Sequence, residues 1–324
     1  MPKMMARPEM PDITDLTRRA DRPALVLGGG GALGVIQATY IEAAFELGFR
    51  PEIVVGTSVG SLNGAWIALH PDRPEELLKI WLGLDRLSLV KFHPARMAAR
   101  LFHPLSVTTN DVVPRLVEEH MGGHSIEDAR LELAVVATNL TRGEKHVFRS
   151  GPLSSAILAS TAIPGVFEPV VLGGDQFVDG CVTASVDMTT AMEMGATEIL
   201  AIDLTPPANL ARPKTAAGVL KQSFSILSTA TTRAVEACLT SQMPVRVIRP
   251  DLSKNSPWRL DDSAGSVARN LRLAREGLRG AFDSDGHVAR DGTCWIDAPR
   301  AGAGEERAAH LPRQYFGHGG RKAS

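Results

Sequence analysis

Residues 24–34 read ALVLGGGGALG, and residues 53–60 read IVVGTSVG. Each stretch begins with a short apolar run, typical of a buried strand, and continues into a glycine turn. Apolar residues recur at helical spacing after both turns, over residues 35–45 and 59–69, and Gly48 is placed to end the first helix. Two successive strand, turn and helix units predict an α/β fold built on a parallel sheet.

The rest of the chain adds elements of both kinds. Further strands are expected at Leu131–Ala137, Lys145–Phe148, Gln176–Val178, Glu198–Ile202 and Val245–Ile248. Helices are expected at Leu153–Ser160, Val186–Met194 and Ser266–Phe282. Residues 84–125 mix apolar and basic side chains without a clean period, so they are predicted only as helices and loops.

Composition excludes several functional classes. The 324 residues contain 35 basic and 36 acidic side chains, so no overall charge favours nucleic acid or an anionic membrane, and any membrane contact must be local. The three cysteines are widely spaced without a CxxC pair, which favours a reducing compartment and no zinc site. Without a secretory signal or an apolar run of roughly 20 residues, the expected location is cytoplasmic.

The chain ends differ in composition from the middle. Residues 1–22 are predicted to be a polar N-terminal extension, and residues 23–282 a single folded domain. Residues 283–324 are rich in Asp, Gly, His, Arg and Ala and poor in apolar side chains, so a disordered tail is expected there.

Gly29, Gly31 and Gly34 form a GxGxxG pattern between a strand and a helix, which by itself suggests a dinucleotide-binding turn. That function needs an acidic residue near the end of the next strand to hold the ribose. The next strand instead leads into Thr57 and Ser58, with no carboxylate. The pattern therefore predicts no nucleotide cofactor.

Gly56-Thr57-Ser58-Val59-Gly60 matches GxSxG, the nucleophile elbow. In this motif a serine sits on a strained strand-to-helix turn, and the flanking glycines remove side chains that would collide with neighbouring backbone. Loops after adjacent parallel strands lie side by side, so the amides of residues 28–31 are expected to face Ser58. Backbone N–H groups in such a loop can stabilise an oxyanion.

The base that activates Ser58 is expected to be Asp179, in the sequence Phe177-Val178-Asp179-Gly180. An ordinary α/β-hydrolase places its acid before its histidine along the chain. Six of the nine histidines lie before Asp179 in the chain, which is the wrong order for such a triad, and the other three lie in the polar tail. All nine are therefore predicted to be surface or structural residues.

Four blocks together resemble the bacterial patatin-like phospholipases: residues 29–34, GTSVG, residues 159–169 (ASTAIPGVFEP) and Val178-Asp179-Gly180. The resemblance covers about residues 24–204. It implies a patatin-like three-layer fold with a mainly parallel central sheet flanked by helices. It also implies hydrolysis of phospholipids, lysophospholipids or related acyl esters without a cofactor or catalytic metal.

Residue by residue, the resemblance implies a catalytic dyad of Ser58 and Asp179 that works through an acyl-enzyme. It implies an oxyanion hole from the backbone amides of Gly29, Gly30 and Gly31. The motif also contains four structural glycines, Gly34, Gly56, Gly60 and Gly180.

Three positions depart from the family pattern. Leu33 stands where the family usually has Arg or Lys, which leaves a preference for phosphate open. Cys181 stands where Gly or Ala is common, and Ser185-Val186-Asp187 replaces a frequent Asn-x-Pro.

Two other functions stay open at the level of sequence. One is an esterase with an ordinary Ser-Asp-His triad, and the other is a lipid-binding protein with weakened catalysis. Peripheral membrane contact is expected at Leu87–Leu105, where apolar residues alternate with basic ones, although a pair of core-packing helices would give the same pattern.

Overall fold

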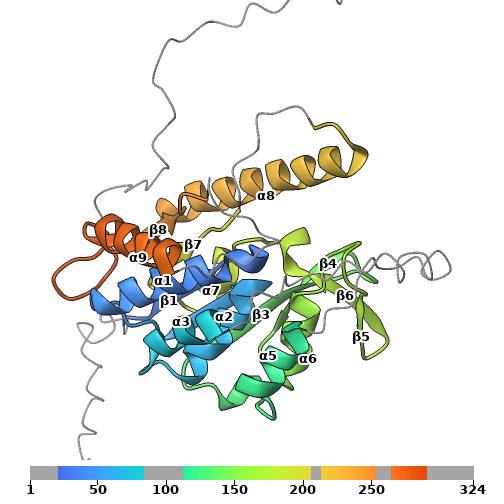
Figure 1. The fold of residues 1–324 in the computed structure, drawn as a ribbon, viewed down its shortest axis with the longest axis horizontal. Coiled ribbons are helices and arrows are strands. Elements are labelled where there is room, and N and C mark those ends of the chain that lie inside the picture. The colour runs from blue at the N-terminus through green and yellow to red at the C-terminus, as the bar shows by residue number, and fades with distance from the viewer. Residues whose placement is uncertain (1–20, 84–111, 206–212, 253–263, 290–324) are drawn as a thin grey trace, which may run out of the picture.

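The computed structural model describes residues 21–83, 112–205, 213–252 and 264–289 (Figure 1). Their strands form one sheet in the order β5-β6-β3-β2-β1-β7-β8, with β4 paired to β3. Pairs β3-β2, β2-β1, β1-β7 and β7-β8 are parallel, and β4, β5 and β6 join antiparallel. The strands are β1 Pro23–Leu27, β2 Ile53–Thr57, β3 Glu132–Asn139, β4 Glu144–Phe148, β5 Val170–Leu172, β6 Asp175–Asp179, β7 Glu198–Ile202 and β8 Val245–Ile248.

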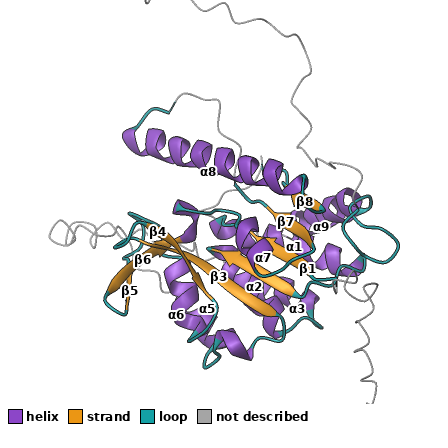
Figure 2. Cartoon of the chain, turned by 180° about the vertical axis from the view of Figure 1, so that it is seen from behind, coloured by secondary structure: helices purple, strands orange, loops and turns teal. Residues whose placement is uncertain are grey.

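Helices cover both faces of the sheet, because alternate strand residues point to opposite sides (Figure 2). Leu25 and Leu27 contribute to a core with α1 Gly34–Glu46, α2 Val59–Leu69, α3 Pro74–Gly83, α5 Val112–Met121, α6 Leu153–Ser160 and α9 Ala264–Leu278. Ala24 and Val26 contribute to a second core with α7 Met188–Glu193 and the C-terminal part of α8 Ala216–Thr240. The predicted three-layer α/β class is confirmed.

Several predicted elements differ from the structure at their ends. The helix expected from Val186 starts at Met188, because Asp187 caps it. The closing helix ends at Leu278 instead of Phe282, and the Phe282 ring stacks on Phe49 with 5.4 Å between ring centroids. The sequence pattern predicts neither β5 nor α8.

The packed part of the chain continues past Phe282. Val288 is buried, its N–H donates to Glu198 Oε2 at 2.9 Å, and the N–H of Ala289 donates to the Ala281 carbonyl at 2.9 Å. The domain limits remain a prediction, and on this packing we move the C-terminal limit from residue 282 to residue 289. Within the described ranges, no helix has the length and apolarity needed to cross a bilayer.

Candidate active site

Ser58 occupies the sharp turn between β2 and α2, with φ 55° and ψ −127°. Among the described residues it is the one non-glycine residue with positive φ, which is a strained conformation that needs support. That support includes a hydrogen bond from the Ser58 N–H to Ser160 Oγ at 2.8 Å, while the Ser160 hydroxyl donates to the Val136 carbonyl at 2.6 Å. The turn also needs Gly60, because a Cβ there would lie 2.1 Å from the Leu27 carbonyl oxygen.

Asp179 ends β6 and lies beside Ser58. Because β6 runs antiparallel to β3, Asp179 pairs with Ala137 at the same edge of the sheet where β2 ends. Ser58 Oγ donates to Asp179 Oδ2 at 2.5 Å, and the Cys181 N–H donates to Asp179 Oδ1 at 2.8 Å. Both carboxylate oxygens are therefore held in one orientation, with one of them on the serine hydroxyl.

The pair is almost completely buried, with Ser58 4% and Asp179 2% exposed. Burial raises the pKa of the Asp179 carboxyl, and the hydrogen bonds from Ser58 and Cys181 partly offset that rise. A carboxylate of raised pKa accepts a proton more readily than an exposed aspartate does. Position and burial together make Asp179 a candidate general base.

The loop of residues 28–34, which we call the glycine loop, lies close to Ser58. A Cβ on Gly29 would lie 3.0 Å from Ser58 Cβ and 2.3 Å from Cys181 Sγ, so only glycine fits there. The Gly29 N–H donates to the Ser185 carbonyl at 3.2 Å. Within the described part of the chain, the N–H groups of Gly30 and Gly31 donate no such bond. Among the contacts of the described residues, Gly30 and Gly31 are therefore the two predicted oxyanion donors whose N–H groups have no backbone acceptor.

A buried network that the sequence pattern does not predict holds both ends of this loop, at Gly28 and Gly34. Gln37 Nε2 donates to the Gly28 carbonyl at 3.0 Å, and Asn63 Nδ2 donates to the Gly34 carbonyl at 3.1 Å. Asn63 also donates to Gln37 Oε1 at 2.9 Å, so the two side chains support each other. No motif signals these residues, because Gln37 and Asn63 lie inside helices whose other positions are mainly apolar.

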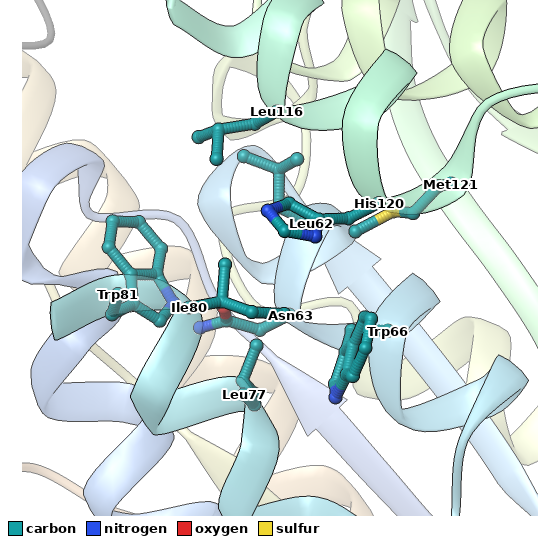
Figure 3. A pocket seen from close by; sticks show the side chains of 9 residues that line it. All are labelled: Leu62, Asn63, Trp66, Leu77, Ile80, Trp81, Leu116, His120 and Met121. Atoms are coloured by element: carbon teal, nitrogen blue, oxygen red, sulfur yellow. The ribbon is translucent and has the colours of Figure 1, made fainter. Parts of the chain in front are cut away.

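Trp81 completes the network from α3, donating from its Nε1 to Asn63 Oδ1 at 2.8 Å. Figure 3 shows Trp81 and Asn63 together at one side of a small cavity between α2, α3 and α5, with Trp66 and His120 further along. The cavity lining is otherwise apolar: Leu62, Leu77, Ile80, Leu116 and Met121. Helices α1, α2 and α3 thus hold the glycine loop together, through the side-chain amides of Gln37 and Asn63 and the indole of Trp81.

The remaining predicted glycines fill tight contacts. A Cβ on Gly34 would lie 2.4 Å from both Trp81 and Val59, and one on Gly56 would lie 2.4 Å from the Gly60 carbonyl oxygen. A Cβ on Gly180 would lie 2.4 Å from the Val136 carbonyl oxygen. These glycines allow loop, elbow and Asp179 turn to pack against one another.

Within the described ranges, no histidine is hydrogen-bonded to Ser58 or Asp179. His70 packs on Trp66, and His146 packs on Phe148 and Phe177. His287 contacts Glu198 instead. His93 and His103 lie outside the described residues. The described residues also contain no cluster of His, Cys, Asp and Glu arranged to hold a metal ion.

A family model for patatin-like phospholipases matches residues 25–192. The chain belongs to the patatin-like phospholipase family. Similar curated proteins include lysophospholipase NTE1 of Phaeosphaeria nodorum, 32% identical over 181 residues, which are 56% of this chain and 12% of that protein. Lysophospholipase NTE1 of Pyricularia oryzae is 31% identical over 204 residues, which are 61% of this chain and 13% of that protein.

The chain therefore corresponds to a small fraction of these much longer proteins. Among solved structures, VipD from Legionella pneumophila has a TM-score of 0.47 and 14% identity, covering 79% of this chain and 65% of that one.

Leu33, where patatin-like phospholipases usually have a cation, is a core residue in this chain. It is only 2% exposed and packs among the residues of the larger core. Within the described residues, the side-chain hydrogen bonds to the carbonyl groups of the glycine loop are the neutral ones from Gln37 and Asn63.

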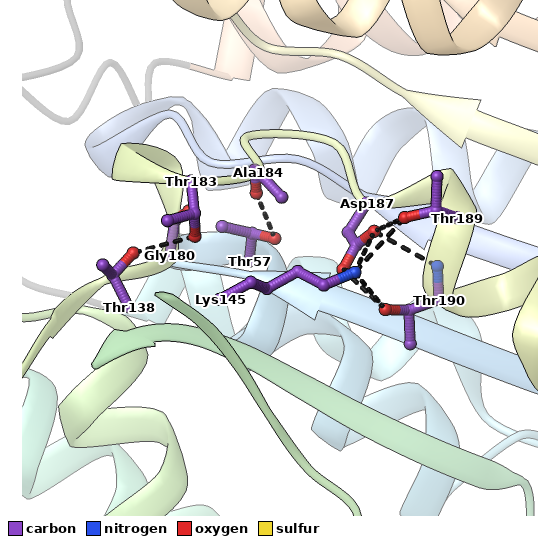
Figure 4. Close-up of polar contacts among 9 residues, drawn as sticks. All are labelled: Thr57, Thr138, Lys145, Gly180, Thr183, Ala184, Asp187, Thr189 and Thr190. Carbon is purple, nitrogen blue, oxygen red and sulfur yellow. Dashed lines mark hydrogen bonds and ion pairs between the residues drawn. The ribbon is translucent and has the colours of Figure 1, made fainter. Parts of the chain in front are cut away.

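Asp187 stands where the patatin-like pattern often has proline. Its carboxylate caps α7 by accepting from the Thr190 N–H at 3.2 Å, and Lys145 Nζ lies 2.9 Å from its Oδ2. Figure 4 shows this cluster beside Thr57, whose hydroxyl donates to the Ala184 carbonyl at 3.1 Å. The segment after Asp179 is thus held by an ion pair and a helix cap.

Proposed function

We propose that this chain is a lipid acyl hydrolase that cleaves carboxylic esters of phospholipids, lysophospholipids or related lipids. The observation that carries the proposal is the 2.5 Å hydrogen bond from Ser58 Oγ to buried Asp179, made at a strained elbow under a glycine loop. Membership of the patatin-like phospholipase family and similarity to lysophospholipases support a lipid ester as substrate.

In the proposed first step, Asp179 Oδ2 accepts the hydroxyl proton while Ser58 Oγ attacks the ester carbonyl carbon. The carbonyl oxygen becomes an oxyanion that the N–H groups of Gly30 and Gly31 face. A single donor of this kind is worth about 2.7–4 kcal/mol in a comparable site. The carbon–oxygen bond to the alcohol then breaks, and the alcohol leaves with the proton from Asp179.

The second step releases the acyl group. Asp179, again ionised, takes a proton from water, and the resulting hydroxide oxygen attacks the acyl-enzyme carbonyl. Ser58 Oγ leaves and recovers its proton from Asp179, and the fatty acid departs. The two residues return to their starting states, so no further proton carrier is required.

A direct test is release of free fatty acid from lysophosphatidylcholine, diacyl phosphatidylcholine and monoacylglycerol by the purified chain. Wild-type protein should release fatty acid from at least one of them, and Ser58→Ala should release none above background. If wild-type protein bound these lipids without hydrolysing any, the lipid-binding alternative would replace the enzyme.

Peripheral membrane contact from the cytoplasmic side accompanies this proposal. The segment predicted to make it, Leu87–Leu105, lies outside the described residues, so its role stays a prediction.

A further inference from the structure

Helix α8 has a packed part and an exposed part. Its C-terminal half packs on α7 and β8, with Ser228, Thr232 and Leu239 buried. Its N-terminal half lies apart from the other helices and strands in both Figure 1 and Figure 2. The helix starts at a true cap, since Thr215 Oγ1 accepts from the Gly218 N–H at 3.0 Å.

The exposed half carries large apolar side chains. They are Val219, Leu220, Phe224, Ile226 and Leu227, with exposed fractions of 51%, 73%, 39%, 52% and 56%. With about 100° of rotation per residue, the centre of this apolar face lies about 130° around the helix from the face that packs on the body. The exposed apolar face is therefore separate from the side of α8 that packs on the body of the protein. Contiguous exposed apolar surface of this kind marks an interaction site.

The charged residues around the exposed half of α8 indicate which kind of partner would bind there. Residues 213–235 contain Lys214, Lys221 and Arg233 and no acidic residue, although the whole chain is balanced. Lys214 and Arg233 are both exposed. Glu236 lies further along α8, in its packed half, where it is paired with Arg249. The exposed half thus combines an apolar face with basic residues and no acidic one, which suits an anionic lipid surface.

The position of α8 connects this surface to the active site. The helix packs against the short turn Gly180–Val182, which directly follows Asp179. Val182 on that turn is itself 37% exposed. The helix that carries the apolar face is therefore also in contact with the turn that follows the proposed base.

We propose that the exposed apolar face of α8 docks this protein on anionic phospholipid surfaces. The inference rests on the proposed lipid hydrolysis for its purpose, although docking itself needs no catalysis. The two can therefore be tested separately.

The test measures sedimentation of the full chain with vesicles of equal parts phosphatidylcholine and phosphatidylglycerol, in a Ser58→Ala background that prevents hydrolysis. Leu220→Ser with Leu227→Ser should lower partitioning at least tenfold, which is about 1.4 kcal/mol. The matched control is Leu140→Ser with Val171→Ser, two side chains of similar exposure, 50% and 63%, of which one directly follows β3 and the other lies in β5. The control pair should partition like the parent, and the parent should bind pure phosphatidylcholine more weakly.

The same two pairs, made with Ser58 intact, should hydrolyse a soluble short-chain ester at the wild-type rate, which shows that the site is undamaged. If neither the wild type nor any variant hydrolyses the ester while the docking results hold, the proposed function fails and the docking surface stands. Equal partitioning of the α8 variant and its parent would overturn the docking proposal. A concentration-dependent dimer lost in the α8 variant, without vesicle binding by the parent, would assign this face to a second copy of the chain.

Discussion

The Asp179 carboxyl is buried against the hydroxyl that it is proposed to deprotonate, and burial raises its pKa above the usual 3.8. Only the ionised carboxylate can accept a proton, so activity should fall as pH drops through this raised pKa. We predict that kcat/KM for a soluble ester has an acid limb with its midpoint above 3.8, recorded as a pH–rate profile. A midpoint at or below that value would show that another group sets the acid limb.

Gln37 offers a test of the buried network at the scale of one side chain. Gln37→Leu keeps the volume and removes the bond to the Gly28 carbonyl, so the oxyanion donors lose part of their alignment. We predict a fall in kcat of about tenfold with KM little changed, since donors aligned on an oxyanion act mainly in the transition state.

Thr39→Val is the matched control for Gln37→Leu. Thr39 lies in the same helix, is equally buried, and donates to the Ile36 carbonyl at 2.7 Å, away from the glycine loop. It should lose stability without losing kcat. Equal kcat losses in the two variants would mean that Gln37 acts through general stability and not through the loop.

Among the elements, α7 depends on a partly buried ion pair between Lys145 and Asp187. Lys145 reaches from β4 to Asp187, whose side chain is 1% exposed. Lys145→Met would leave that carboxylate without its cation. Because Lys145 is itself 28% exposed, we predict a loss of about 2–3 kcal/mol in the free energy of unfolding by urea, the value of a hydrogen bond to a charged group and less than a fully buried pair would give. The comparison is Arg142→Met, because Arg142 is 64% exposed and its pair with Asp175 should contribute under about 1 kcal/mol. Similar losses in both variants would contradict this account.

The elements that the sequence predicts best are those whose side chains are mostly buried. The strands at Glu198–Ile202 and Val245–Ile248 and the helix at Leu153–Ser160 have the predicted bounds, because short apolar runs between turn residues mark buried elements. Helix α8 was not predicted, because its apolar residues lie on one side in the N-terminal half and its buried residues on another side in the C-terminal half. The sequence therefore shows no single apolar stripe at helical spacing. Strand β5 has three residues at the edge of the sheet, too few for a period to show.

For the whole molecule, the C-terminal limit can be tested by truncation. A chain ending after Ala289 should keep the wild-type melting temperature. A chain ending after Asp283 loses buried Val288 and the contacts of His287 and Val288 with Glu198. We predict that the shorter chain is less stable by about 1.5–3 kcal/mol, the value of one buried apolar side chain, in thermal or urea unfolding. Equal stability would return the limit to residue 282.

Most of the candidate site was predictable because its residues sit in motifs whose spacing reflects turn geometry. Ser58 and Asp179 lie 121 positions apart, and the antiparallel pairing of β6 with β3 brings them together. Pairing between strands is invisible in a single sequence, so the partnership came from the family resemblance. Gln37 and Asn63 were missed for the same reason, since their value depends on which carbonyl groups lie opposite them.

The central claim is that Asp179 activates Ser58 without a histidine. Asp179→Asn keeps the shape of the side chain and removes its basicity, and removing a buried ionisable carboxyl of raised pKa should not lower the melting temperature at neutral pH. The direction of this effect follows from the raised pKa, because the folded state holds the Asp179 proton more tightly than the unfolded state does. The contribution of Asp179 to folding stability is therefore lost as the pH rises from the unfolded pKa through the raised folded pKa, and the ionised carboxylate adds no stability at neutral pH. Asp187→Asn, a second buried aspartate outside the dyad, controls for loss of a buried charge.

The decisive measurement is kcat/KM of Asp179→Asn for a soluble short-chain ester, beside Asp187→Asn and the wild type. We predict that Asp179→Asn falls by orders of magnitude while Asp187→Asn keeps most of its activity per folded molecule. Turnover by Asp179→Asn above about one tenth of the wild-type rate, an effect under about 1.4 kcal/mol, would contradict the dyad.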